Sequence, residues 1–125
     1  MSKAFVFIWM LFNHVLDDYC LQGILATMKQ KSWWEENYPN LMYKNDYIVA
    51  LIMHSISWSF MILLPIAVYH NFNIDIGFIM TFIWNVIVHA FIDNLKANKL
   101  QINLIFDQTV HIFQIILTFM GLIFY

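Results

Sequence analysis

The chain has 125 residues, of which 62% are hydrophobic and only 11% are charged, and its formal net charge is −2. A soluble domain carries about 25% charged residues, so this chain has too few of them to cover its surface in water. The composition excludes a soluble protein and indicates a membrane protein of a single domain, residues 1–125. The sequence holds no basic patch, so we expect no nucleic acid among its partners.

The first predicted helix covers about residues 4–27, which is long enough to cross a hydrocarbon core of about 30 Å. No small-residue cleavage site follows its apolar start, so we expect it to be retained rather than removed as a signal peptide. His14, Asp18 and Gln22 recur every four residues and share one face, whereas Asp17 points elsewhere. Ionisable groups at such depth survive by facing a bundle interior or a cavity.

The remaining elements follow from long apolar runs separated by short polar segments. Residues 28–45 mix lysines and glutamates with tryptophans and tyrosines, which predicts a loop in the headgroup region, and Pro39 is expected to break any short helix there. Further helices are predicted over about 46–69, where Pro65 is expected to kink the far end, over 76–96 and over 104–124. The fold class is therefore all-α, a polytopic bundle of four antiparallel transmembrane helices.

The lysines set the expected orientation, because the chain has no arginine. The N-terminus, the second connection and the C-terminus together hold only Lys3. The positive-inside rule then places the first and third connections in the cytoplasm and both termini outside, in the inner (cytoplasmic) membrane of a cell. The lysines of these two connections are Lys29, Lys31, Lys44, Lys96 and Lys99.

Histidines and aspartates repeat at one spacing in three of the four helices. His14 and Asp18 are four residues apart, as are His89 and Asp93, and the order is reversed in Asp107 and His111. Because the last helix runs in the opposite direction, the reversal places every aspartate nearer the cytoplasm and every histidine one turn deeper. His54, the one ionisable group inside the second helix, falls at the same depth, roughly 10–15 Å from the inner end.

Histidine combined with aspartate is a ligand set for a divalent transition metal, with zinc the first expectation and iron or manganese the alternatives. The set exceeds one tetrahedral shell, so either some members orient the ligands or two ions share the site. Two other interpretations remain open, namely a polar network that ties the helices together and a path for protons or cations. The expected ligands are His14, Asp18, His54, His89, Asp93, Asp107 and His111, with Asp18, Asp93 and Asp107 as catalytic candidates.

Five further residues are candidates for the surroundings of the site or for substrate binding. Gln22 and Asn85 share faces with the histidines and are expected to donate hydrogen bonds to the site or to tie helices. Lys31 and Lys96 are candidates for binding an anionic headgroup or phosphate, although an ordinary interfacial anchor is the simpler explanation of each. Gln108, which follows Asp107, completes the group.

The motifs resemble those of an uncharacterised family of small integral membrane proteins of bacteriophages and bacteria, a domain of unknown function. The resemblance covers nearly the whole chain and implies a polytopic helical protein encoded by a phage, but no activity. A looser similarity, in histidine and aspartate usage, is to membrane-bound metal-dependent hydrolases, although the chain has no H-E-x-x-H motif. The motifs are His14-x3-Asp18-x3-Gln22, then Lys31 and His54, His89-x3-Asp93-x2-Lys96, and Asp107-Gln108-x2-His111.

The sequence therefore predicts an intramembrane site near the cytoplasmic leaflet. As an enzyme, the protein would hydrolyse a lipid or lipid-linked substrate, with an ion activating water and a spare aspartate acting as general base. As a transport or binding protein, it would pass a proton or a divalent cation through the same residues. As a structural phage membrane protein, for instance a lysis or host-exclusion factor, it would use them only to tie helices.

Overall fold

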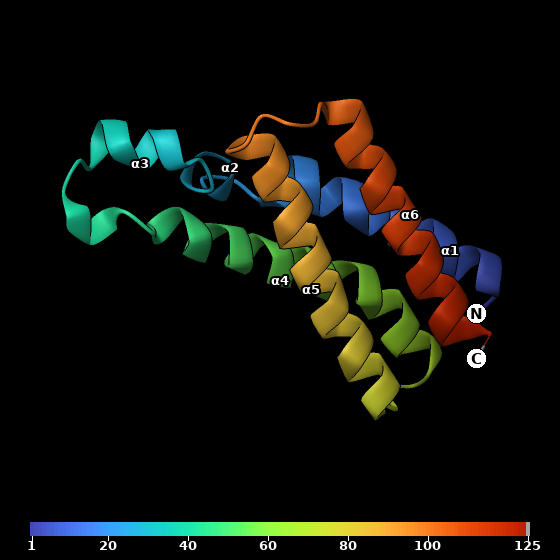
Figure 1. Cartoon of the computed structure of the whole chain (residues 1–125). Coiled ribbons are helices and arrows are strands. Elements are labelled where there is room, and N and C mark those ends of the chain that lie inside the picture. Colours follow the sequence, from blue (N-terminus) through green and yellow to red (C-terminus); the bar gives the residue numbers. More distant parts are fainter. Residues whose placement is uncertain (125) are drawn as a thin grey trace.

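The structure is a computed structural model, and it describes residues 1–124. Four long helices pack into an antiparallel bundle (Figure 1), which confirms the all-α prediction, and no strand occurs within this range. Each of the four is long and apolar enough to cross a membrane, so the chain is a multi-pass membrane protein. The helices are α1 (Lys3–Leu16) with its continuation η1 (Asp17–Leu21), α4 (Asp46–Tyr69), α5 (Ile76–Ala97) and α6 (Leu104–Ile123).

The two ends of the bundle differ in character. The N-terminus and the C-terminal end of α6 lie side by side at one end (Figure 1), together with the turn between α4 and α5. The opposite end carries Lys29, Lys96 and Lys99 and is called the lysine end below. Because α1 and α5 run toward the lysine end and α4 and α6 run away from it, the four histidine-bearing segments meet at one level.

The first helix is shorter than predicted, and its expected continuation to Thr27 is wrong. After Leu16 the backbone widens into one π-helical turn, in which the amide of Gln22 donates to the carbonyl of Asp17 at 3.1 Å. Gly23 then adopts a positive φ of 49°, which ends the helix at a conformation that glycine adopts without steric cost. The chain turns here and continues as the short helix α2 (Leu25–Met28).

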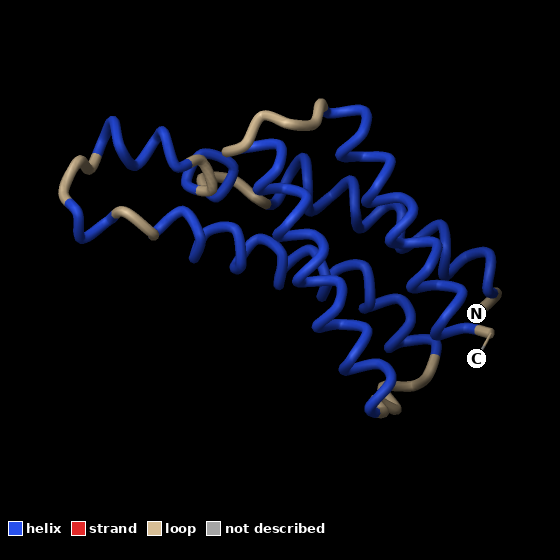
Figure 2. The backbone as a smooth tube through the Cα atoms, viewed as in Figure 1, coloured by secondary structure: helices blue, strands red, loops and turns tan. Residues whose placement is uncertain are grey.

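The expected loop 28–45 contains two short helices, α3 (Lys31–Asn37) and the 3₁₀ turn η2 (Leu41–Tyr43). In Figure 2 this segment leaves the bundle and returns to the start of α4. Helix α3 ends two residues before Pro39, as expected for a residue that cannot continue a helix. Trp34 is buried within an aromatic group, and its ring lies 6.2 Å from and nearly parallel to that of Tyr43.

Helix α4 continues through Pro65 to Tyr69. Proline has no amide proton, so the carbonyl of Met61, one turn earlier, loses its helical partner. The side-chain amide of Asn13 on α1 donates to that carbonyl at 2.7 Å. Inside a bilayer a freed carbonyl needs such a partner, because lipid supplies none. One side chain of α1 therefore compensates for the proline of α4 and ties the two helices together.

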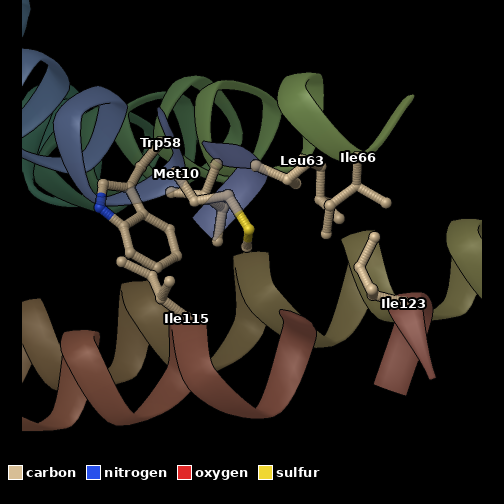
Figure 3. Packing of buried hydrophobic residues seen from close by; sticks show 8 residues of the cluster. Met10, Trp58, Leu63, Ile66, Ile115 and Ile123 are labelled. Carbon is tan, nitrogen blue, oxygen red and sulfur yellow. The ribbon is translucent and has the colours of Figure 1, made fainter. Parts of the chain in front are cut away.

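The half of the bundle away from the lysine end holds the apolar core (Figure 3). Met10 from α1, Trp58 from α4 and Ile115 from α6 pack together there, and all three are fully buried. The outward faces are apolar as well, as on α1, where Ile8 and Phe12 are exposed. An apolar surface around a partly polar interior is suited to contact with lipid and unsuited to water.

Candidate functional site

The polar side chains in the half of the bundle nearer the lysine end form one buried cluster. The side chains of His54, His89 and His111 are turned so that their Nε2 atoms approach the carboxylates of Asp18 and Asp93. None of these five residues is more than 8% exposed. The sequence spacing that predicted a common depth thus corresponds to a common location in the structure.

Three donor atoms in this cluster have the spacing of a metal centre. Nε2 of His54 lies 3.2 Å from Nε2 of His89 and 3.3 Å from Oδ1 of Asp18, and the remaining distance, from His89 to Asp18, is 3.9 Å. Tetrahedral zinc with ligands at about 2.0–2.2 Å requires donor atoms roughly 3.3–3.6 Å apart. Only small movements would therefore place these three atoms around one ion.

A second group of donors overlaps the first. Oδ1 of Asp93 lies 3.3 Å from Nε2 of His111 and 3.9 Å from Nε2 of His89, so these three residues could also hold an ion. Both groups use Nε2 of His89, which has a single lone pair in neutral imidazole. The two groups are therefore alternative positions for one ion rather than two sites filled together.

Two lysines neutralise part of the acidic charge. Nζ of Lys29 lies 2.6 Å from Oδ2 of Asp93, and Nζ of Lys96 lies 2.7 Å from Oδ2 of Asp107. Lys96 thus takes the position next to the site that the sequence suggested. Lys31 does not: its ammonium pairs with Glu35 at 3.3 Å, and both side chains are largely exposed. Lys29, two residues earlier, reaches the cluster in its place because the chain turns at Gly23.

Gln108 connects three polar groups at the edge of the cluster. Its Nε2 lies 3.2 Å from Oδ2 of Asp18 and 3.1 Å from Oδ2 of Asp107, and its Oε1 lies 3.1 Å from Nε2 of His14. Asp107 in turn approaches Nε2 of His111 at 3.4 Å. Gln108 therefore holds two carboxylates close to each other without adding charge.

His14 is engaged on both ring nitrogens. The indole N–H of Trp58 donates to its Nδ1 at 2.8 Å, and because indole nitrogen is a donor only, Nδ1 carries no proton. Nε2 therefore carries it and donates to Oε1 of Gln108. Neither nitrogen is free, so in this arrangement His14 is a hydrogen-bonding residue and not the metal ligand that the sequence suggested.

Two of the expected surrounding residues do not contact the donor atoms of the cluster. Asn85 is fully buried one turn beyond His89, away from the lysine end, and bonds with Gln114 at 2.9 Å and Thr118 at 2.9 Å. It forms a second polar cluster that joins α5 to α6. Gln22 donates its side-chain amide to the carbonyl of Asp18, which links it to the π-helical turn rather than to a histidine.

Sequence reasoning missed three residues of the cluster. Asp17 was expected to point elsewhere, but it is fully buried, and its Oδ2 lies 3.6 Å from Nδ1 of His54. The π-helical turn explains this position, because a wider turn separates adjacent residues by a smaller rotation about the helix axis. Trp58, four residues after His54, stacks on His89 with ring centroids 4.2 Å apart. Lys29, already described, is the third.

The chain was compared with protein-family models, with curated proteins and with solved structures, and none of these matches it.

Proposed function

We propose that the protein binds one divalent transition-metal ion inside the bilayer, through Asp18, His54 and His89. The observation that carries the proposal is the set of three donor atoms at 3.2–3.9 Å from one another, all buried. Three ligands from two helices and the π-helical turn converge there, which leaves a fourth coordination position for water or substrate, as in catalytic zinc sites.

The charges of the cluster support a dication. Four aspartates lie in it, whereas Lys29 and Lys96 are the two ammonium groups that pair with them in the described part of the chain. With neutral imidazoles the cluster keeps an excess of two negative charges, and buried charge of this kind is costly unless it is paired or bound to a metal. A divalent ion would neutralise the excess. The four carboxylates belong to Asp17, Asp18, Asp93 and Asp107.

The donors favour zinc, with iron or manganese as alternatives. Two imidazoles and one carboxylate are the ligands of zinc hydrolases and also of non-haem iron centres, whereas the thiolates typical of structural zinc sites are absent from the described cluster. Cys20, the single cysteine of the chain, is exposed and does not contribute.

As an activity we propose hydrolysis of a lipid or lipid-linked substrate. An ion in this position would act as a Lewis acid and activate water. Asp93, whose Oδ2 lies 3.5 Å from Nε2 of His54, is the carboxylate placed to accept a proton, while Lys29 holds that carboxylate in position. The lysine end, proposed to face the cytoplasm, would then be the side from which a headgroup approaches.

Metal analysis of the protein purified in detergent tests the metal site. We expect about one zinc per chain, lost in His89→Ala, because His89 belongs to both donor groups. Asn85→Ala is the matched control: it also shortens a fully buried polar side chain of α5, but one outside the donor groups, and it should keep the metal. Wild-type protein that retains no zinc after reconstitution and carries no zinc into liposomes would show that the cluster only ties helices together.

Passage of a cation is the second candidate, and the shared position of His89 favours it. Two overlapping donor groups allow an ion to move from one to the other while His89 stays bound. A path must release its ion, whereas a hydrolase holds it tightly. Zinc flux into liposomes that His89→Ala abolishes, with no metal retained after purification, would favour passage. Retained metal together with chelator-sensitive release of lipid headgroups would favour hydrolysis.

The resemblance to small membrane proteins of bacteriophages and bacteria remains part of this proposal. It adds an origin in a phage or a bacterium, whereas the proposed orientation, with both termini outside the cytoplasm, rests on the distribution of the lysines. It is supported by the motifs, since Asp107, Gln108 and His111 all contact the polar cluster.

A further inference from the structure

Asp17 is not a ligand of the proposed metal centre, but its carboxylate faces Nδ1 of the ligand His54, the ring nitrogen opposite the metal-binding Nε2. We infer that Asp17 is a positioning residue: its carboxylate holds the proton of His54 on Nδ1 and so leaves the lone pair of Nε2 free for the ion. This inference rests on the proposed metal site and adds a residue to it.

The two atoms concerned face each other and have no other partner. Nδ1 of His54 and Oδ2 of Asp17 are 3.6 Å apart, and both are buried without a hydrogen bond. The separation is too long for a hydrogen bond, but a charge-assisted bond would form if it shortened to about 2.8 Å. Unsatisfied polar atoms are rare in buried positions, so a mutual pair of them indicates an interaction that closes in the functional state.

The other oxygen of Asp17 is already fixed. The hydroxyl of Ser57 donates to Oδ1 at 2.6 Å, which orients the carboxylate so that Oδ2 points at the imidazole. Ser57 lies three residues after His54 on α4, on a neighbouring part of the same face. The π-helical turn of η1 places Asp17 next to His54, because it turns both Asp17 and Asp18 inward.

Asp17 and Asp18 compete for the single proton of neutral His54. Oδ1 of Asp18 lies 3.3 Å from Nε2, so on its own it would draw the proton to the nitrogen that must stay free. Asp17 draws it to the opposite nitrogen. Histidines that bind metals usually donate their second N–H to a carboxylate or carbonyl, which fixes the tautomer and the ring orientation. Asp17 occupies that position relative to His54.

Nitrogen NMR of the imidazoles in detergent-purified protein tests the inference without requiring a metal. The His54 signal is assigned by its loss in His54→Asn. In the wild type we expect the proton on Nδ1, and in Asp17→Leu, which keeps a similar volume but removes the acceptor, we expect it on Nε2. Asp17→Asn retains an acceptor oxygen and should largely restore the wild-type tautomer. The same His54 tautomer in the wild type and in Asp17→Leu would overturn the role of Asp17.

Cobalt binding to the same variants measures the consequence for the ligand. We expect Asp17→Leu to weaken cobalt binding about 10–100-fold and to change the cobalt absorption spectrum, as loss of a residue behind a ligand does. Asp75→Asn, at the other end of the bundle, should change neither, because Asp75 only caps α5. Wild-type protein that binds no cobalt would overturn the proposed metal site. Unaltered affinity and spectrum in Asp17→Leu would instead overturn the role of Asp17.

Discussion

At the level of single residues, Trp58 packs against three histidines. Its indole N–H fixes the tautomer of His14, its ring stacks on His89, and it lies 5.5 Å from the ring of His111. It also separates the polar cluster from the apolar core shown in Figure 3, of which it is itself a member. One fully buried side chain thus contacts both halves of the bundle.

Replacing this tryptophan tests its hydrogen bond. Trp58→Phe keeps most of the ring but leaves Nδ1 of His14 buried without a donor, which costs about 1–3 kcal/mol. We expect the unfolding free energy, measured by denaturant titration in detergent, to fall by that amount. Trp84→Phe, at a position that is 40% exposed on the outer surface, should change it by less than about 0.5 kcal/mol. Equal losses in both variants would show that ring size alone matters.

The two neighbouring lysines give a matched pair of substitutions. Lys29→Met leaves Asp93 without its ammonium partner, and removal of one member of a buried ion pair costs about 3–5 kcal/mol. Because Lys29 keeps 14% exposure, we expect a loss at or just below the lower end of that range, about 2–3 kcal/mol. Lys31→Met disrupts an exposed pair worth about 0–1 kcal/mol. Similar stabilities of the two variants would contradict the assignment of Lys29 to the cluster.

At the level of elements, the contacts between α1 and α4 compensate for irregular or polar positions. Pro65 leaves the carbonyl of Met61 free, and Asn13 supplies the missing donor. A kink was predicted at Pro65 from the sequence. Helix α4 continues for another turn beyond the proline, so the main effect of Pro65 is the freed carbonyl of Met61.

A double-mutant cycle measures the compensation. Asn13→Leu in the wild type should cost about 1 kcal/mol, within the range found for hydrogen bonds between membrane helices. In a Pro65→Ala background the alanine amide can bond to Met61 within the helix, so the same Asn13→Leu change should cost close to nothing. The coupling energy of the cycle, from denaturant titration, should therefore be about 1 kcal/mol. Equal costs in both backgrounds would mean that Asn13 does not serve this carbonyl.

Sequence patterns located the long helices and most of the polar cluster for a simple physical reason. Helices in lipid must be long and apolar, so their bounds are visible, and the four-residue spacing of Asp93 from His89 survives any packing arrangement. The same reasoning failed where the backbone departs from α-helical geometry. Helical periodicity assumes regular turns. It therefore predicted that Asp17 faces away from the site and that the first helix continues past Gly23, and for this reason Lys29 was not expected in the cluster. Trp58 was missed because a buried tryptophan has the same pattern whether it only packs or also donates.

At the level of the whole molecule, the interior of the bundle is polar in the half near the lysine end and mainly apolar in the other half, and this asymmetry links orientation to function. The lysine end is proposed to face the cytoplasm by the positive-inside rule. The candidate site lies nearer to that end, beneath Lys29 and Lys96.

Cysteine labelling in sealed cells tests the orientation. In a Cys20→Ser background, Lys99→Cys places a thiol in the exposed connection between α5 and α6, and Asn73→Cys places one in the exposed turn between α4 and α5. A membrane-impermeant maleimide should label the cysteine at position 73 in intact cells and the cysteine at position 99 only after permeabilisation. The reverse pattern would place the lysine end outside.

The distribution of contacts around α1 also bears on how the chain enters the membrane during synthesis. Alone, this segment is a poor substrate for insertion, since an aspartate costs up to about 2.5–3.5 kcal/mol at the centre of a helix on the translocon scale. The span Lys3–Leu21 carries two aspartates in η1, nearer its end. The residues that satisfy its polar groups lie largely on α4, the next long helix to be synthesised: Met61 accepts from Asn13, and Trp58 and Ser57 donate to His14 and Asp17. We therefore expect the first segment to enter the lipid together with α4, as a hairpin, rather than alone.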